Sequence, residues 1–308
     1  MAATPTRAPM TVDETVKRTA LRNILLATDF SDCSKNALRY GLGIARRNSS
    51  RLYLLNAVHS IGYLLGGGGV AAQAGVQIWH DARRLERELI RDGFLVGIEH
   101  EFLVLDGPPS TVISQVAEEK NVDLIIIGTH GRHGLTKLLL GSCAEKVFRS
   151  ASCPVLTVGS WIWRPLSAGL GPRRILLLTD FSAASKPAAE YALLLACRSG
   201  TELIALHVIA ENGDLTRKSS RVAEEMALQT SRGFGSIKLG QVTPQVQVWT
   251  GPLPRTILEV ARQVSADLLV MTVDSKSTGH LQGSIAYRVI CESECPVLTI
   301  PTEARSRR

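Results

Sequence analysis

The chain has 308 residues, of which 45% are hydrophobic and 20% are charged, a balance that is typical of globular proteins and not of fibrous or disordered ones. Its 35 Lys and Arg residues outnumber its 28 Asp and Glu residues, which gives a net charge of +7. A basic surface suits nucleic acid or nucleotide phosphates, but no basic block with interleaved aromatic residues is visible. We therefore do not expect nucleic-acid binding, and the length allows two domains.

The six cysteines are scattered and lie mostly inside apolar segments. This pattern predicts buried, reduced thiols in a cytoplasmic protein and not a disulfide framework. The spacing from Cys291 to Cys295 has no second paired cluster, so we expect no metal site. Cys33 and Cys143 each fall near an expected helix start, where the helix dipole can lower a thiol pKa. Inert packing is nevertheless preferred over redox sensing.

No export signal or membrane span is expected in this sequence. The N-terminus lacks the hydrophobic region of a signal peptide. Residues 52–80 contain no Lys, Arg, Asp or Glu, but a run of glycines at 66–69 and several polar side chains interrupt them.

In the first half of the chain, short apolar runs alternate with stretches whose apolar residues recur at helical spacing. Strands are expected at 23–28, 52–58, 99–105, 124–127 and 154–158. Helices are expected at 32–47, at 76–92, at 111–120 after an N-cap at Ser110, and from Ser142 onward. The glycine-rich segment 61–76 has no assignment. This alternation predicts an α/β fold with a parallel sheet and right-handed crossovers.

The same succession returns in the second half. The segment RILLLTDF at Arg174–Phe181 repeats RNILLATDF at Arg22–Phe30, and Pro296–Thr299 repeats Pro154–Thr157. A period of about 145 to 150 residues is too long for a solenoid unit, so we expect a duplicated domain. The expected parts are a disordered tail at 1–18, a first domain at 19–158, a linker at 159–172, a second domain at 173–302 and a basic tail at 303–308.

The stretch from Val122 to Val158 carries the most distinctive chemistry. A buried strand leads into a loop that contains Gly128, Gly131, Gly134 and Gly141, and a helix follows. The order of strand, glycine loop and helix N-terminus makes an anion site, because free backbone N–H groups and the helix dipole point at one spot. Glycines at 128 and 131 would also permit positive φ. Taken alone, the spacing leaves phosphate binding and simple tight turns equally open.

Ser142 and Glu145 form a capping-box pattern, so Ser142 is expected to be the N-cap of the helix after this loop. The loop also carries cationic or titratable side chains at Arg132, His133 and Lys137.

Gly128-x-x-Gly131, nine residues, and then Gly141-Ser142 resembles the ATP-binding signature of the universal stress protein family. The flanks, Asp123 before the strand and Cys153–Leu156 after it, are similar to that family as well. The resemblance extends over nearly the whole chain. It implies two tandem open parallel-sheet domains, Rossmann-like and adenine nucleotide alpha hydrolase-like, with strand order 3-2-1-4-5. It also implies that ATP or another adenine nucleotide is bound.

The resemblance places the ligand at the switch point between the first and fourth strands, where ligands of open α/β sheets bind. The matching positions are Thr28, Asp29, Ala57, Ile127, Gly128, Gly131, Gly141, Ser142 and Cys143. Asp29, beside Thr28, matches the residue that contacts the adenine, and Ala57 matches a small apolar adenine contact. Asp29 can instead be only a helix cap, since its copy Asp180 persists in the second half without the glycine loop.

The remaining matches concern the ribose and phosphates. Gly128 and Gly131 match the ribose and phosphate glycines, while Gly141, Ser142 and the N–H of Cys143 match the phosphate cradle. A Mg²⁺ ion would be held through phosphate oxygens, because no dedicated carboxylate pair is evident.

The second half departs from this pattern. Thr272 and Ser275 replace the first two glycines, Asp274 adds a negative charge, and the loop before Gly283 is shorter. Added side chains and like charge both oppose phosphate binding. We expect the second half to bind nucleotide weakly or not at all, with Gly283-Ser284 serving as a helix start.

The sequence lacks a Walker A motif and a Gly-x-Ser-x-Gly nucleophile elbow. His130 and His133 are candidate acids or bases, but hydrogen bonding is the preferred interpretation. We expect a nucleotide-binding stress-response regulator and not an enzyme. The alternatives are a weak ATP hydrolase or autokinase, and a ligand-free scaffold that uses strands 154–158 and 296–300 as pairing edges. The resemblance implies that these last strands pair as a built-in pseudo-dimer, and a homodimer or an unidentified protein partner stays open.

Overall fold

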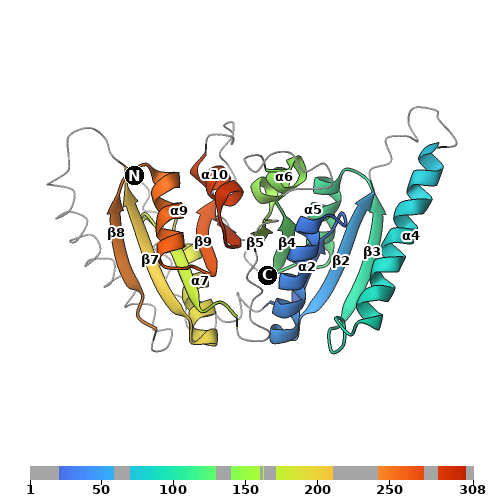
Figure 1. The fold of residues 1–308 in the computed structure, drawn as a ribbon, viewed down its shortest axis with the longest axis horizontal. Coiled ribbons are helices and arrows are strands. Elements are labelled where there is room, and N and C mark those ends of the chain that lie inside the picture. The colour runs from blue at the N-terminus through green and yellow to red at the C-terminus, as the bar shows by residue number, and fades with distance from the viewer. Residues whose placement is uncertain are drawn as a thin grey trace, which may run out of the picture.

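The computed structural model describes residues 21–58, 70–129, 140–159, 162, 171–210, 242–273 and 284–302. The first half contains β1 (Asn23–Ala27), α2 (Asp32–Asn48), β2 (Arg51–Val58), α4 (Val70–Arg91), β3 (His100–Asp106), α5 (Pro109–Glu119), β4 (Leu124–Gly128), α6 (Ser142–Ser150) and β5 (Val155–Val158). The second half contains β6 (Arg174–Leu178), α7 (Lys186–Ser199), β7 (Glu202–Ile209), β8 (Gln245–Thr250), α9 (Leu253–Gln263), β9 (Leu268–Val273), α10 (Ile285–Glu292) and β10 (Val297–Pro301). The halves lie side by side (Figure 1).

All strands join one 10-stranded sheet in the order β3-β2-β1-β4-β5-β10-β9-β6-β7-β8. Pairing is parallel within each half, which confirms the expected α/β fold and the strand order 3-2-1-4-5. The halves meet where β5 and β10 pair antiparallel, with Leu156 opposite Leu298. The Thr157 hydroxyl donates to the Val297 carbonyl at 3.1 Å, and the Thr299 hydroxyl donates to the Val155 carbonyl at 3.2 Å. The expected pairing of the last strands is therefore confirmed within one chain.

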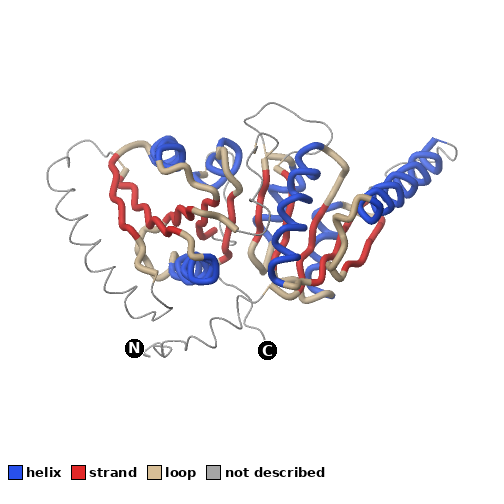
Figure 2. Tube along the Cα trace, turned by 60° about the horizontal axis from the view of Figure 1, so that its bottom comes forward, coloured by secondary structure: helices blue, strands red, loops and turns tan. Residues whose placement is uncertain are grey.

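The sheet is covered by helices on both sides (Figure 2). Alternate residues of each strand point to opposite faces, so Ile24 and Leu26 pack on the side of α2 while Leu25 and Ala27 pack on the side of α5 and α6. Each of the two cores runs through both halves of the molecule. Central strands that are buried on both faces read as continuous apolar runs, which explains why they were predictable.

The aspartate before the fourth strand of each half has a structural task. Asp123 Oδ2 accepts hydrogen bonds from the backbone N–H groups of Arg22 and Asn23, at 2.6 and 2.9 Å. In the second half Asp267 Oδ2 accepts from the two equivalent backbone N–H groups at 3.0 and 3.1 Å. Asp123, which contributes to the family resemblance, thus fixes the start of β1 and lies at the sheet edge away from the predicted ligand.

Two helices begin earlier than the sequence suggested. Helix α4 starts at Val70 and not at 76, so the last part of the glycine-rich segment is helical, and the rest of it lies outside the described residues. Helix α5 starts at Pro109 with Pro108 as its N-cap, so the expected cap at Ser110 is wrong. Proline suits a first helical position because the N–H it lacks would have no partner there. Within the described ranges, no helix combines the length and the apolar character needed to cross a membrane.

All six cysteines are free thiols. Burial raises the pKa of the Cys291 and Cys295 thiols from an ordinary value of 9.0 to about 11. Because the pKa is raised in the folded state, each thiol contributes stability that is complete below pH 9.0 and is lost as the pH rises through about 11. These thiols are inert packing groups at neutral pH.

We expect the melting temperature to fall between pH 9.0 and about pH 11, because the unfolded thiols ionise while the folded ones remain protonated. A Cys295→Ala variant should show a shallower fall than the wild type over this window. Thermal denaturation followed by circular dichroism at several pH values measures the difference. Parallel pH profiles for the two proteins would contradict this assignment.

Candidate functional site

The expected switch point brings the ends of β1 and β4 to one edge of the sheet. These strands are direct neighbours, with Leu26 opposite Ile126. Beyond β1, the Thr28 N–H donates to the Leu55 carbonyl of β2 at 2.8 Å. Beyond β4, the Thr129 N–H donates to the Val158 carbonyl of β5 at 3.0 Å. Thr28 and Thr129, the residues that follow β1 and β4, are therefore both held by hydrogen bonds to neighbouring strands of the same sheet.

Asp29 follows β1 and holds the residue that caps the next helix. Ser31 is the N-cap of α2, and its hydroxyl accepts from the Ser34 N–H at 3.3 Å. Asp29 Oδ1 in turn accepts from the Ser31 N–H at 3.1 Å and from its hydroxyl at 2.6 Å. Asp29 is thus not the cap itself but the group that orients it.

The second half repeats this arrangement. Asp180 Oδ1 accepts from the Ser182 N–H at 3.0 Å and from its hydroxyl at 2.7 Å. The aspartate therefore has a structural role in both halves, which accounts for its presence at Asp180 regardless of any ligand.

Gly128 ends β4 against the first turn of α2. A Cβ at this position would lie 2.9 Å from Cys33 Cβ, 3.0 Å from the Cys33 carbonyl carbon and 3.1 Å from the Ser34 backbone nitrogen. Glycine is needed here because the backbone of the strand touches the backbone of the helix. Its φ lies outside the positive range, so the expectation of positive φ at Gly128 is wrong.

In the second half, Thr272 stands at the position of Gly128, and the following helix starts later. Helix α7 begins at Lys186, whereas the residue that corresponds to the start of α2 is Ala183. Pro187 contributes to the delay, because it has no N–H to donate into a turn begun at Ala183. The second half therefore differs from the first both in the residue at the strand end and in the start of the helix that follows the first strand.

Gly141 closes the segment that follows β4. Its N–H donates to the Thr129 carbonyl at 2.8 Å, so a hydrogen bond joins the residues on either side of the segment 130–139. Gly141 is also the N-cap of α6, and as a glycine it offers no side chain to cap this helix. The expected capping box is therefore wrong: Ser142 is the first helical residue, and its side chain is exposed.

Helix α10 of the second half, unlike α6, is capped by a side chain. A helix start was expected at Gly283-Ser284; Ser284 is the N-cap, and its hydroxyl accepts from the Tyr287 N–H at 3.1 Å. The first N–H groups of a helix have no acceptor inside it. In α6 the N-cap is a glycine, which has no side chain to take that place, and a helix N-terminus of this kind has the capacity to bind an anion.

Cys143 lies in the first turn of α6, and Asp29, which follows β1, affects the pKa of its thiol. The pKa of the Cys143 thiol is raised to about 11, mainly by burial and also by the Asp29 carboxylate, while Lys146 lowers it. The thiol is thus not activated by the helix dipole, contrary to one of the two expectations for this cysteine. This effect of Asp29 agrees with the pairing of β1 with β4 and with the Gly141–Thr129 hydrogen bond, which bring the start of α6 to the same edge of the sheet.

Asn56, just before Ala57 in β2, is a site residue whose role the sequence did not reveal. It is 2% exposed, and its Nδ2 donates to the Thr28 carbonyl at 2.6 Å. His207 makes the equivalent contact in the second half, with Nδ1 3.0 Å from the Thr179 carbonyl. Asn56 therefore holds the backbone that leads into Asp29, and Ala57 lies half-buried on the other face of the strand, against the core beside α5 and α6.

The structure brings together Thr28, Asp29, Ala57, Ile127, Gly128, Gly141, Ser142 and Cys143 on adjoining strand ends and at the start of α6. The other predicted loop residues lie outside the described part of the chain: His130, Gly131, Arg132, His133, Gly134, Lys137, Asp274, Ser275 and Gly283. Trp161 and Trp163 of the linker lie outside it as well.

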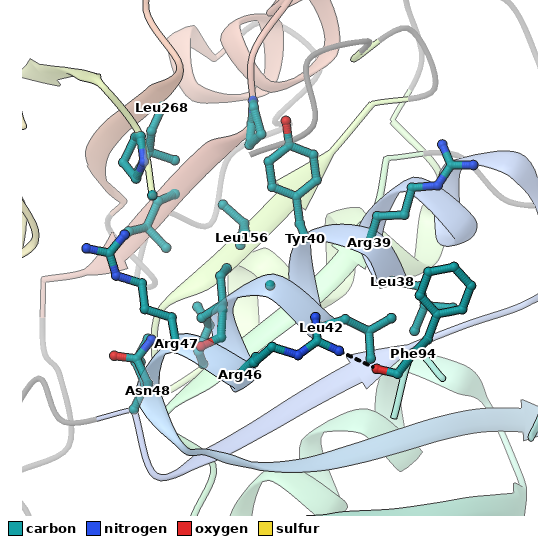
Figure 3. Close-up of a pocket in the computed structure, with 18 of the residues that line it drawn as sticks. Leu38, Arg39, Tyr40, Leu42, Arg46, Arg47, Asn48, Phe94, Leu156 and Leu268 are labelled. Atoms are coloured by element: carbon teal, nitrogen blue, oxygen red, sulfur yellow. Dashed lines mark hydrogen bonds between the residues drawn. The ribbon is translucent and has the colours of Figure 1, made fainter. Parts of the chain in front are cut away.

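A separate cavity of about 980 Å³ lies along α2 and reaches the opposite edge of the sheet (Figure 3). Its lining includes Leu124 and Leu268, the first residues of β4 and β9, together with apolar side chains of α2 and α4. Arg46 Nη2 donates to the Phe94 carbonyl at 2.9 Å at its rim. This cavity does not include the residues of the predicted nucleotide site.

Comparison with known proteins agrees with this architecture. The family model described as "Universal stress protein family" matches residues 20–159 and 171–301. The chain is 30% identical over 142 residues to universal stress protein MJ0531 of Methanocaldococcus jannaschii, a match that covers 44% of this chain and 81% of the relative. It is 36% identical over 143 residues to a universal stress protein of Thermus aquaticus, covering 44% of this chain and 98% of the relative.

A solved structure shows the same fold over most of the chain. A universal stress protein from Archaeoglobus fulgidus aligns with a TM-score of 0.66 at 22% identity, covering 91% of this chain and 98% of that one. Another universal stress protein was solved in complex with cAMP; it is 22% identical, covers 46% of this chain and 98% of its own, and has a TM-score of 0.35, so that ligand is a fact about that protein alone. With the family pattern matched in both halves, this chain belongs to the universal stress protein family.

Proposed function

We propose that the first half binds an adenine nucleotide, ATP in the first instance, and that the protein acts as a nucleotide-responsive regulator and not as a catalyst. The observation that carries this proposal is the difference between two equivalent helices. Helix α6 starts at a glycine N-cap, which has no side chain, and exposes Ser142, whereas the Ser284 hydroxyl caps α10. A helix N-terminus with a glycine N-cap, beside a glycine loop, suits phosphate, because its N–H groups and dipole favour negative charge.

The charges around this position suit a nucleotide that lies with its phosphates on α6 and its base toward β1 and β2. An ionised carboxylate only accepts hydrogen bonds, so Asp29 should meet the adenine amino group or a ribose hydroxyl and not a phosphate. Ala57 follows in β2 and offers a small apolar surface for the base. Gly141, Ser142 and the Cys143 N–H then face the phosphates, and a Mg²⁺ ion would be held through phosphate oxygens.

The second half is proposed to bind no nucleotide. Three features support this: Thr272 replaces the glycine of the strand end, Ser284 caps its own helix, and the first turn after β6 is not helical. The stoichiometry should therefore be one nucleotide per chain.

A matched pair of serine variants tests the proposal. Ser284→Ala removes a side-chain cap and should lower the free energy of unfolding by about 1 kcal/mol, with a smaller effect on ATP affinity than that of Ser142→Ala. Ser142→Ala removes no cap, so it should leave stability near that of the wild type. It should weaken ATP binding about ten-fold, because a hydroxyl bonded to a charged phosphate is lost.

Isothermal titration calorimetry with ATP and chemical denaturation measure the two quantities. Absence of ATP binding by the wild type, or an unchanged Kd in Ser142→Ala, would count against the proposed site. Phosphate release measured on the same proteins separates a binder from a slow hydrolase. Turnover that disappears in a Gly131→Ala, Gly141→Ala double variant would favour the hydrolase.

A further inference from the structure

A tyrosine of the second half reaches the end of the glycine loop of the first half. The Leu140 N–H donates to Tyr287 Oη at 3.0 Å, across 147 positions of sequence. Both residues are buried, with Leu140 5% and Tyr287 3% exposed, and both belong to the core on the side of α6 and α10. Figure 1 shows α6 and α10 on either side of the junction between the halves.

Leu140 occupies a decisive position in the chain. It is the first residue after the segment 130–139 and directly precedes Gly141, the N-cap of α6. The backbone that leads into α6 is held by hydrogen bonds from two consecutive N–H groups, those of Leu140 and Gly141. The Gly141 N–H is bonded to the Thr129 carbonyl of the first half, and the Leu140 N–H is bonded to Tyr287 of the second half.

The anchor is specific to the second half. The residue at the position of Tyr287 in α6 is Glu145, whose side chain differs in shape and charge. Cys291, one turn further along α10, is buried in the same core as Leu140 and Tyr287. Burial raises the pKa of the Tyr287 hydroxyl, and its neutral oxygen can accept the hydrogen bond from the Leu140 N–H.

We propose that Tyr287 is a positioning residue for the nucleotide site of the first half, through which the second half sets the affinity of that site. This inference rests on the proposed function of the first half. Tyr287 does not contact the nucleotide; it fixes the backbone of Leu140 and, through it, the start of α6. A buried N–H that loses its acceptor is costly, so without the hydroxyl this backbone should sample other positions and the phosphate cradle should be less well ordered.

Calorimetric titration of ATP into the full chain tests the coupling. Tyr287→Phe keeps the ring and removes only the hydroxyl, and it should raise the Kd about ten-fold. Tyr191→Phe is the matched control, because it removes a buried tyrosine hydroxyl from α7 on the other side of the sheet; its Kd should equal that of the wild type. An unchanged Kd in Tyr287→Phe, or an equal loss in both variants, would overturn the proposal.

Hydrogen exchange of the Leu140 amide gives a second readout that needs no nucleotide. In the wild type this amide should be protected, and in Tyr287→Phe it should exchange about ten-fold faster, with no change in Tyr191→Phe. If the wild type binds no ATP, the proposed function fails, whereas protection lost only in Tyr287→Phe still supports Tyr287 as the anchor of this backbone. An unprotected Leu140 amide in the wild type would refute the anchor itself.

Discussion

A Gly128→Thr variant is expected to bind ATP roughly 30- to 150-fold more weakly than the wild type, a loss of about 2–3 kcal/mol. The substitution introduces the residue that the second half carries at this position, Thr272. In the first half its Cβ would lie 3.0 Å from the Cys33 carbonyl carbon and 3.1 Å from the Ser34 nitrogen. These are backbone atoms of a helical turn, so the first turn of α2 must move away from β4 and take Asp29 with it.

Calorimetry with ATP measures the affinity, and a thermal melt shows how much of the loss is a loss of folded protein. The reciprocal change, Thr272→Gly, is the control. It should not create a second site, because the Ser284 cap and Pro187 remain in place. A Gly128→Thr protein with wild-type affinity would show that contact between β4 and α2 does not shape the site.

The glycines at 41 and 43 of helix α2 should respond to alanine in opposite directions. A Cβ at Gly41 would overlap Leu26 Cδ1 and come within 3.5 Å of Ile126 Cδ1, and both of these side chains are fully buried. Overpacking of this kind costs about 1–3 kcal/mol. At Gly43 a Cβ meets nothing within 4 Å, so alanine there should stabilise the helix by about 0.5–1 kcal/mol.

Chemical denaturation of Gly41→Ala and Gly43→Ala against the wild type gives both values from one helix and one kind of substitution. Because helix propensity changes equally in the two variants, the difference between them isolates the packing of α2 on β1 and β4. Two variants of equal stability would mean that α2 does not approach the sheet as closely as the structure places it.

The asymmetry between the halves arises from few residues on one shared fold. Both halves have the same winding order, the same aspartate that orients a serine, and the same contact to the threonine carbonyl, from Asn56 or from His207. They differ where the fourth strand meets the first helix and where the last helix begins. The second half, which is proposed to bind no nucleotide, contributes Tyr287, whose hydroxyl accepts a hydrogen bond from the Leu140 N–H of the first half.

The sequence by itself was sufficient for the class of fold, the duplication and the approximate strands. Strands such as β1 and β4 are buried on both faces, so their continuous apolar runs stand out without any knowledge of their neighbours. The strand order and the residues of the site came from the likeness of the glycine motif to a known family, and the structure confirms the order. The locations of Gly131 and the rest of its loop stay predictions.

Only the tertiary structure decided how the helix starts are built. The residues from Ser142 to Glu145 match a capping-box pattern. In the structure the Gly141 N–H is hydrogen-bonded to the Thr129 carbonyl, and the N-cap is Gly141, one residue earlier than predicted. Gly128 matches a ligand glycine in sequence, yet a helix distant in the chain dictates it sterically. A local sequence pattern indicates the propensity of a segment to form a helix or strand. Helix caps, close backbone contacts and the hydrogen bond between Leu140 and Tyr287, 147 residues apart, depend instead on which segments the fold brings into contact.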